Sequence, residues 1–417
     1  MTGRPLAAYT AVTAAYWAFM LTDGALRMLV LLHFHTLGFS PLQLAYLFLL
    51  YEFAGIVTNL SAGWLAARFG LTSTLYAGLA IQIAALMALA RLDPGWGVAA
   101  SVIYVMAVQG ASGVAKDLAK MSSKSAVKLL APEAPGGLFR WVAWLTGSKN
   151  AVKGLGFLLG AALLALAGFV PALLAMAGVL AAILAGVALF MPGGLPRGRR
   201  GVPFSDVFSK DPDINRLSAA RLFLFAARDA WFVVGIPVYF YSVLSDGSAA
   251  GNRWAFFAIG VFMAGWIILY GGVQAAAPRF LRATQATRAE SVAQARAWVG
   301  WLALIPAGLA LAAVLAGGPA PWLTAVLVAG LLAFGAVFAV NSALHSYLIL
   351  AFSQGARVSM DVGFYYMSNA AGRLLGTLIS GLGYQVGGVT GCLGAAAVLA
   401  GCSFVAAGRL SRGLVRP

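Results

Sequence analysis

The chain has 417 residues, of which 61% are hydrophobic and only 10% are charged. Soluble globular proteins carry about 25% charged residues, so an ordinary water-soluble enzyme is excluded. The formal net charge of +16 would suggest a nucleic-acid partner in a soluble protein. The apolar residues instead lie in long runs, and a run of about 20 can cross a bilayer. We therefore predict an all-α polytopic protein whose partner is the lipid bilayer, with no nucleic acid.

The apolar runs predict twelve transmembrane helices in two sets of six. The first set is expected at 8–35, 43–66, 71–90, 96–116, 138–168 and 171–191. The second set is expected at 217–243, 252–277, 297–317, 322–346, 361–386 and 388–408. The intervening segment is rich in Gly, Pro and charge, which is typical of a solvated linker. We predict an N-terminal six-helix bundle over 1–191, a cytoplasmic linker over 192–216 and a C-terminal bundle over 217–417.

The distribution of cations predicts the orientation. If the N-terminus is cytoplasmic, the cytoplasmic loops and the termini hold 20 of the 28 Lys and Arg residues. The outer loops then hold only Arg91 and Arg253. Because short cytoplasmic loops collect Lys and Arg, we expect both termini inside, in the inner (plasma) membrane.

Short matches between the two halves indicate an internal parallel repeat. Asp23 is followed ten to twelve residues later by His-Phe-His (33–35), and Asp229 is followed at the same offsets by Tyr-Phe-Tyr (239–241). These positions are displaced by 206 residues. A second pair, Asn150 and Asn369, is displaced by 219 residues.

Two predicted helices carry paired charges. Asp23 and Arg27 are four residues apart and share a helix face, so they form either a self-neutralising structural pair or part of a site. Arg228 and Asp229 are adjacent in sequence, so we expect each to find its partner on another helix. An ionised residue inside the bilayer is costly, which makes each of these a candidate for function.

Three lysines are candidates for binding an anion. The uncharged remainder of the fifth span, 154–168, is about 22 Å long at 1.5 Å per residue, too short to cross a hydrocarbon layer of about 30 Å. At least Lys153, and with it Lys149 one turn earlier, is therefore expected inside the membrane. Lys116 ends the fourth span, where it could be either functional or solvated. We expect Lys124 and Lys128 to form a solvated cytoplasmic face.

Cations outnumber carboxylates among the charges predicted to face inward, and a polyanionic ligand would neutralise the surplus. The substrate-binding candidates are Arg27, Lys116, Lys149, Lys153 and Arg228. Glu52 is isolated in an apolar helix, where burial disfavours its charged form. It is either a proton carrier or permanently paired with a cation of another span. The proton-coupling candidates are Asp23, Glu52 and Asp229.

Chemistry beyond transport has little support. The two cysteines, Cys392 and Cys402, lack metal-ligand spacing, and His33 and His35 fall on different helix faces. No nucleophile–base arrangement or phosphate-binding glycine loop occurs, so we predict neither an enzyme nor a cofactor or metal. A membrane receptor or lipid-handling scaffold is the alternative class, but every loop is too short to form a sensor domain.

Two six-helix halves with a cytoplasmic linker resemble the major facilitator superfamily. The loop after the second span, GWLAARFG (63–70), follows that superfamily's Gly-x-x-x-Asp-Arg-x-Gly signature, except that Ala67 replaces the Asp. In the fourth span QGASG (109–113) resembles a second motif of the superfamily, with Met106 in place of its Arg.

Four longer stretches resemble the ArsJ-type organoarsenical efflux permeases. They are Thr22–Ala45, Tyr51–Gly70, Ser112–Glu133 and Leu145–Gly160, in continuous order along the N-terminal half. The second half matches mainly through SNAAGRLLG (368–376), a broader superfamily pattern. The resemblance implies export of 1-arseno-3-phosphoglycerate, made when a glyceraldehyde-3-phosphate dehydrogenase uses arsenate in place of phosphate. The alternative is an organophosphate:phosphate antiporter or another organic-anion exporter.

Overall fold

The computed structural model describes residues 3–69, 71–130, 137–190, 208–281, 288–353 and 358–413. Side chains within these ranges are described except at 3–10, 62–71, 121–147, 190, 278–280, 358–360 and 411–413. The side chains of the 63–70 motif, Lys124 and Lys128 therefore lie outside the described part, as does most of the predicted linker.

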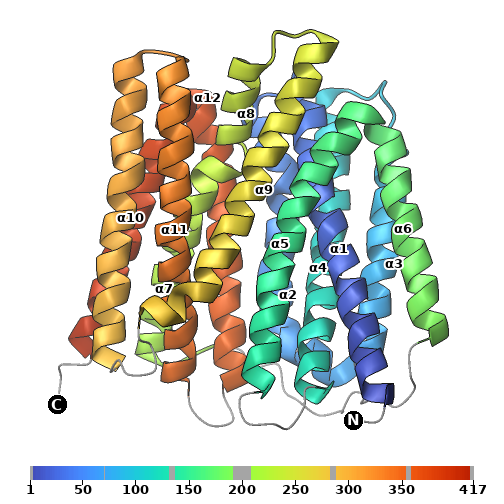
Figure 1. Ribbon diagram of the computed structural model, residues 1–417, viewed down its shortest axis with the longest axis vertical. Coiled ribbons are helices and arrows are strands. Elements are labelled where there is room, and N and C mark those ends of the chain that lie inside the picture. Colours follow the sequence, from blue (N-terminus) through green and yellow to red (C-terminus); the bar gives the residue numbers. More distant parts are fainter. Residues whose placement is uncertain are drawn as a thin grey trace.

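The first half consists of six helices, which agree with the predicted spans to within a few turns. They are α1 (Gly3–Thr36), α2 (Pro41–Phe69), α3 (Leu71–Leu89), α4 (Val98–Leu130), α5 (Gly137–Leu166) and α6 (Phe169–Phe190). Helix α4 continues well past its predicted run, which ends at 116, to Leu130 at the end of the molecule where α1 begins (Figure 1). We call this end the terminal end, because α12 also finishes there.

The second half contains the remaining helices of the described chain. They are α7 (Pro212–Phe232), α8 (Gly235–Leu244), α9 (Ala249–Phe280), α10 (Arg288–Ala316), α11 (Pro321–Phe352) and α12 (Val358–Gly413). Helix α7 starts inside the predicted 192–216 linker. Asp211 caps it, accepting hydrogen bonds from the backbone N–H groups of Asp213 and Ile214.

Helix α12 is two membrane crossings joined by a sharp turn. Its apolar part is 50 residues long, or about 75 Å at 1.5 Å per residue, far more than a hydrocarbon layer of about 30 Å. The helical geometry fails at Gly387 and Gly388, and Gly388 has φ of 57°, a left-handed conformation that favours glycine. The break falls where the predicted spans 361–386 and 388–408 meet. We call residues 358–386 the first arm of α12 and residues 389–413 the second arm.

The predicted seventh span is broken into α7 and α8. Pro237 explains the break, because its ring clashes with the carbonyl one turn earlier and it has no N–H to donate. The backbone N–H groups of Val234 and Gly235 both donate to Ser380 Oγ, each at 3.1 Å. A side chain of α12 thus satisfies the donors that the break releases inside the membrane.

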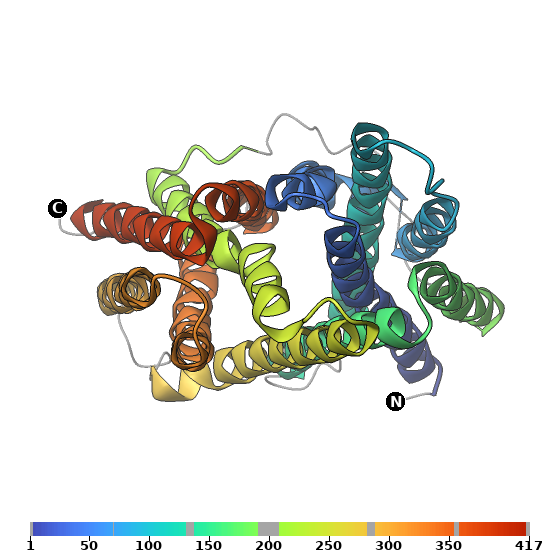
Figure 2. The same ribbon diagram turned by 90° about the horizontal axis from the view of Figure 1, so that it is seen from above.

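The two halves lie side by side and meet along two seams (Figure 2). On one side α2 runs beside the first arm of α12, and the backbone N–H of Leu42 donates to Gln385 near the end opposite the terminal end. On the other side α5 runs beside α9, where Asn150 Nδ2 donates to Gln274 Oε1. The charged residues considered below lie on α1, α2, α4, α5, α7 and the first arm of α12.

Both halves use the same small-residue packing, which supports the internal repeat. Helix α5 lies so close to α1 that a Cβ on Gly160 would collide with the backbone of Ala25. In the second half the first arm of α12 approaches α7 in the same way, and a Cβ on Gly376 would lie 2.7 Å from the carbonyl oxygen of Ala226. Close helix contacts through small residues are common in membranes, where lipid provides no hydrophobic drive for helix association.

His35 and Tyr241 give the repeat a second support. They are displaced by the same 206 residues as Asp23 and Asp229, and their rings meet edge-on with centroids 4.8 Å apart. Equivalent positions touch each other when two like units are related by a two-fold axis. The contact joins α1 to α8 near the end opposite the terminal end.

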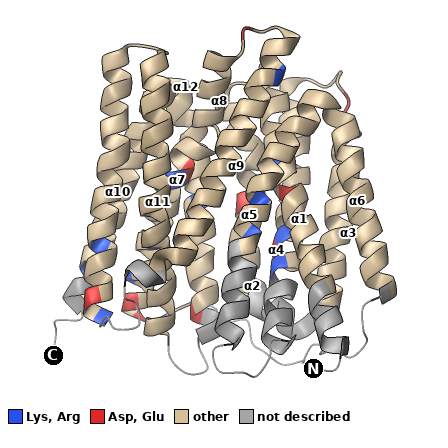
Figure 3. Cartoon of the chain, viewed as in Figure 1, with Lys and Arg blue, Asp and Glu red and all other residues tan. Residues whose placement is uncertain are grey.

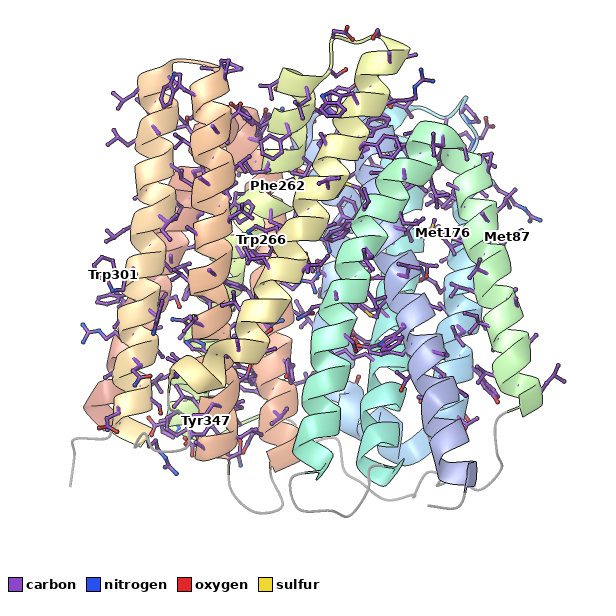
Figure 4. The ribbon with its side chains drawn as sticks, in the orientation of Figure 1. Met87, Met176, Phe262, Trp266, Trp301 and Tyr347 are labelled. Carbon is purple, nitrogen blue, oxygen red and sulfur yellow. The ribbon has the colours of Figure 1, made fainter. Side chains whose placement is uncertain are left out.

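The outer surface is apolar at the height of the spans. Helix α10 exposes Trp301, Leu304, Leu311 and Leu315 on one side, with exposed fractions of 65%, 62%, 59% and 74%. Trp301 projects away from the bundle, whereas Trp266 lies inside it (Figure 4) and donates from its indole to Leu331 O. A soluble monomer rarely exposes so much contiguous apolar surface, whereas a lipid-facing surface requires it. Eleven described helices are long and apolar enough to cross a membrane, and α12 accounts for two crossings.

Candidate functional site

Charged residues of both halves lie at mid-height in the molecule (Figure 3). They come from α1, α2, α4, α5, α7 and the first arm of α12. We call this group the central cluster; its members are Asp23, Arg27, Glu52, Lys116, Asp117, Lys120, Lys153, Arg228, Asp229 and Arg373. Seven of the eight sequence-predicted site residues belong to it.

Asp23 is paired with a lysine of another helix and not with Arg27. Lys153 Nζ lies 3.0 Å from Asp23 Oδ2, and the Tyr51 hydroxyl donates to Asp23 Oδ1 at 2.5 Å. Of the two interpretations of Asp23 and Arg27, the self-neutralising pair is therefore wrong. The close α1–α5 packing brings the two side chains together, which same-helix spacing could not reveal.

Glu52 holds two arginines, one from each half. Its Oε1 accepts from Arg27 Nη1 at 3.0 Å and from Arg373 Nη2 at 2.6 Å. Glu52 is fully buried, and its second oxygen has no hydrogen-bond partner in the described structure; nor does Arg27 Nη2. The sequence left Glu52 as either a proton carrier or a carboxylate paired with a cation of another span. In this conformation it is paired with cations of two other helices. The unmade bonds leave both partners able to take another hydrogen-bonding group.

Arg228 and Asp229 do contact each other, contrary to expectation. The Arg228 guanidinium curls back along α7 and donates to Asp229 Oδ1 at 2.6 Å. The long arginine side chain can reach its neighbour's carboxylate although the two Cβ atoms point in different directions. Asp229 Oδ2 also faces Arg373 Nε at 3.5 Å, so Arg373 links Asp229 to Glu52.

The pairing in the two halves is equivalent. In the first half an aspartate of α1, Asp23, meets a cation of α5, Lys153. In the second half an aspartate of α7, Asp229, meets a cation of the first arm of α12, Arg373. These helices occupy the first and fifth positions of their six-helix units. The internal repeat thus includes this pairing of an aspartate with a cation in each half.

Lys116 is the cation of the central cluster whose described contact is with an aromatic ring and not with a carboxylate. It is 7% exposed, and its ammonium lies 4.0 Å from the centre of the Tyr51 ring. It forms no ion pair or hydrogen bond with any described residue, although it is close enough to Asp117, Asp23 and Glu52 to interact with their charges. Gly55 on α2 faces the same spot, where a Cβ would stand 3.9 Å from Lys116 Nζ.

Both carboxylate oxygens of the neighbouring Asp117 have partners. Its carboxylate accepts from the Thr58 hydroxyl at 2.6 Å and lies 3.4 Å from Lys120 Nζ. Lys120 also donates to Asn59 Oδ1 at 2.8 Å. These contacts join α4 to α2 on the terminal-end side of Lys116.

Lys149, the eighth predicted site residue, lies one turn before Lys153 on α5 and is half-buried. It has an interaction partner of its own. The ion pairs that define the central cluster do not include Lys149.

The central cluster carries a surplus of positive charge. Six cations face four carboxylates, and the cluster is buried, where charge interactions are stronger than in water. Within the described residues no group of three or more His, Cys, Asp or Glu side chains is placed to hold a metal. The arrangement suits a small molecule with more than one anionic group.

Four residues in or against the cluster were not selected from the sequence as site residues: Arg373, Lys120, Tyr51 and Asp117. Arg373 is a cation inside a predicted span, the same signal that selected Arg27. Lys120 lies one turn after Lys116, beyond the predicted end of the fourth span. Tyr51 and Asp117 had no such signal, because an aromatic residue in an apolar run and an acid at a span end are common.

The two histidines of the first predicted span lie outside the cluster. His33 stacks on Phe169 with centroids 3.9 Å apart, and His35 contacts Tyr241. Both contacts lie toward the end opposite the terminal end, away from the charged side chains.

Several solved structures share this fold but are far from the chain in sequence. A point mutant of the nucleoside transporter NupG superposes with a TM-score of 0.70 at 17% identity, over 98% of this chain and 100% of that one. A POT family transporter in complex with 5-aminolevulinic acid gives a TM-score of 0.72 at 14% identity, over 100% and 98%. A structure described for substrate recognition in proton-dependent oligopeptide transporters gives 0.70 at 14%, over 98% and 99%.

No model of a known protein family matches the sequence, and no curated protein does. The structural likeness over the whole length nevertheless defines the architecture. The chain is a multi-pass membrane protein with the major facilitator fold, in two six-helix halves.

Proposed function

We propose that this chain is a membrane transporter that carries small organic anions through the central cluster. The observation that carries the proposal is Lys116, a buried ammonium that has only an aromatic ring for a described partner. The carboxylates near Lys116 are already paired with other cations, so a bound anion could form a charge-assisted contact with this ammonium. The fold is that of transporters for nucleosides and peptides, which supports a small-molecule cargo.

The substrate that we propose is 1-arseno-3-phosphoglycerate, exported from the cytoplasm to confer arsenate resistance. Support comes from the four stretches that resemble the ArsJ-type permeases. This molecule has a phosphate at one end and an arsenate ester at the other, so it matches a cluster with two surplus positive charges. We propose that the protein lies in the inner membrane with both termini in the cytoplasm. A cytoplasmic glyceraldehyde-3-phosphate dehydrogenase would be the source of the substrate.

We assign roles within the cluster from the partners of each group. Lys116 binds an oxyanion directly, and Arg27 offers the free Nη2 edge of its guanidinium to the same ligand. Lys149, Lys153 and Arg228 complete the predicted substrate contacts. Asp23 pairs with Lys153, Glu52 with Arg27 and Asp229 with Arg228. Each carboxylate can accept a proton when a bound anion takes its place beside the cation.

A binding measurement with a stable mono-organophosphate tests the class of ligand. Purified protein should bind glycerol 3-phosphate by isothermal titration calorimetry. Lys116→Met should weaken binding at least about tenfold, because charge-assisted hydrogen bonds contribute about 1.5–3 kcal/mol. Melting of Lys116→Met without ligand should be unchanged, since this lysine has no described ion pair to lose. Unchanged binding by this variant would refute the assignment of the site.

An organophosphate:phosphate antiporter is the second candidate, because the positive surplus does not by itself distinguish a phosphate from an arsenate ester. Vesicles loaded with phosphate should then take up glycerol 3-phosphate by exchange. An exporter of the organoarsenical alone should show no such exchange.

A further inference from the structure

A second buried cation lies outside the central cluster. Arg221 on α7 is 4% exposed and has no ion pair with a described residue. Its Nε donates to Asn369 Oδ1 at 3.1 Å, and its Nη1 donates to the carbonyl and hydroxyl oxygens of Ser342 at 3.2 and 3.0 Å. All of these acceptors are neutral. Its remaining nitrogen, Nη2, donates to no residue in the described structure.

Unpartnered polar groups surround this arginine. His345 on α11 is fully buried, and neither of its ring nitrogens has a hydrogen-bond partner among the described residues. It lies one turn beyond Ser342, the residue of α11 to which Arg221 donates two hydrogen bonds. The hydroxyl of Ser218, one turn before Arg221 on α7, is also buried without a described partner. Buried polar groups are almost always hydrogen-bonded, so this concentration of unused donors is unusual.

The position of Arg221 relates it to the central cluster. Arg221 and Arg228 are seven residues apart, on one face of α7 and about 10 Å apart along its axis. The ring of Phe225 lies between them, 4.1 Å from the Arg221 guanidinium and 4.8 Å from that of Arg228. Arg221 is therefore one layer closer to the terminal end, on the same face that carries the central cluster.

Hydrogen bonds connect this layer to the other half. Ser342 Oγ accepts from Gln274 Nε2 at 3.3 Å, and Gln274 Oε1 accepts from Asn150 Nδ2 at 3.5 Å. Asn150 and Asn369 are the two asparagines displaced by 219 residues, and both belong to this chain of contacts. The layer thus links α5 of the first half to α7, α9, α11 and α12 of the second.

We propose that Arg221, together with His345, forms a second anion site that binds one oxyanion group such as a phosphate. Arg221 Nη2 provides charge-assisted hydrogen bonds, and His345 and Ser218 provide further donors. The group comes either from free inorganic phosphate or from the phosphate end of an organophosphate on its way to the central cluster. The assignment goes beyond the central cluster and does not depend on which molecule is transported.

His345→Leu is the first test, because it leaves every described hydrogen bond of Arg221 intact. It removes two buried nitrogens that have no described hydrogen-bond partner, so the protein without ligand should melt at the same or a higher temperature. Inorganic phosphate should nevertheless bind at least about tenfold more weakly, as loss of one hydrogen bond to a charged group implies. Thr377→Val is the matched control, since it removes another buried unpartnered hydroxyl and should leave phosphate affinity unchanged.

Phosphate binding at Arg221 is distinguished from binding at the central cluster by measurements on the Lys116→Met variant. Phosphate should still raise the melting temperature of Lys116→Met, and adding Arg221→Gln or His345→Leu should abolish that rise. Loss of the rise in Lys116→Met alone, or its persistence in both double variants, would overturn the second site. Neither result would contradict the proposed function, because that function is tested by transport of the organoarsenical.

Glycerol 3-phosphate distinguishes the sources of the oxyanion. If the site receives the end of an organophosphate, Arg221→Gln should weaken binding of glycerol 3-phosphate, and inorganic phosphate should compete with it. If it binds only the free ion, Arg221→Gln should affect inorganic phosphate alone. An affinity for both ligands that is unaffected by Arg221→Gln contradicts the proposal.

Discussion

Arg373 of the second half donates to Glu52 of the first half at 2.6 Å. This ion pair joins α2 to the first arm of α12 at the level of the central cluster. Arg27 shares the same carboxylate oxygen. One buried carboxylate thus holds two guanidinium groups that would otherwise repel each other, and an incoming anion would compete with it for both.

Glu52→Gln tests that competition. A neutral amide at this position cannot neutralise Arg27 and Arg373, so the protein without ligand should lose about 3–5 kcal/mol, as when one partner of a buried pair is removed. Anion binding should be retained or tightened, while transport driven by a pH gradient should be lost. Titration calorimetry and vesicle uptake measure the two effects, with the exposed loop variant Asp246→Asn as control. Undiminished dependence on the pH gradient would remove Glu52 from proton coupling.

The Asp23–Lys153 pair separates a structural role from a substrate-binding one. Asp23→Asn or Lys153→Met alone should destabilise the protein by about 3–5 kcal/mol, because each leaves a buried charge unpaired. The double variant should recover most of the melting temperature. If Lys153 also binds substrate, the double variant should fold and yet fail to transport. Normal transport by the stable double variant would show that the pair serves only the fold.

The close contact of α5 with α1 predicts opposite effects of two similar substitutions. Gly160→Ala should destabilise by about 1–3 kcal/mol, since the new methyl group meets the backbone of Ala25. Gly178→Ala on α6 should stabilise by up to about 1 kcal/mol, because nothing lies within 4 Å of its Cβ position and alanine favours helix. Thermal melting in detergent measures both. Equal effects of the two substitutions would refute the packing of this helix pair.

Much of the fold follows from simple length and composition. The long apolar runs locate the crossings, and the Gly387-Gly388 pair marks the turn within α12 because glycine alone adopts positive φ freely. Seven of the eight charges selected as site residues lie in the central cluster, since buried ionised groups must find partners away from lipid. The partners themselves could not be predicted. Spacing along a helix says nothing about which helix faces it, so the Asp23–Lys153 pair depends on a close helix packing that only the structure shows.

The orientation remains a prediction from the cation distribution. In a chain with Cys392 and Cys402 replaced by alanine, single cysteines at Asp93 and Asp246 should react with an impermeant thiol reagent added outside intact cells. Both positions are exposed, in the loops opposite the terminal end. A cysteine at Arg199 in the linker, or at Lys210 just before α7, should be protected. Labelling of either in intact cells would reverse the topology.

Uptake of arsenic into everted membrane vesicles tests the proposed function most directly. Vesicles that contain the protein should accumulate arsenic only when arsenate, glyceraldehyde 3-phosphate, NAD and the dehydrogenase are all supplied, so that the labile ester forms in place. Lys116→Met vesicles should accumulate no more than vesicles without the protein. If plain arsenate or arsenite accumulates equally well without the dehydrogenase, the organoarsenical is not the substrate, and the protein exports an inorganic oxyanion.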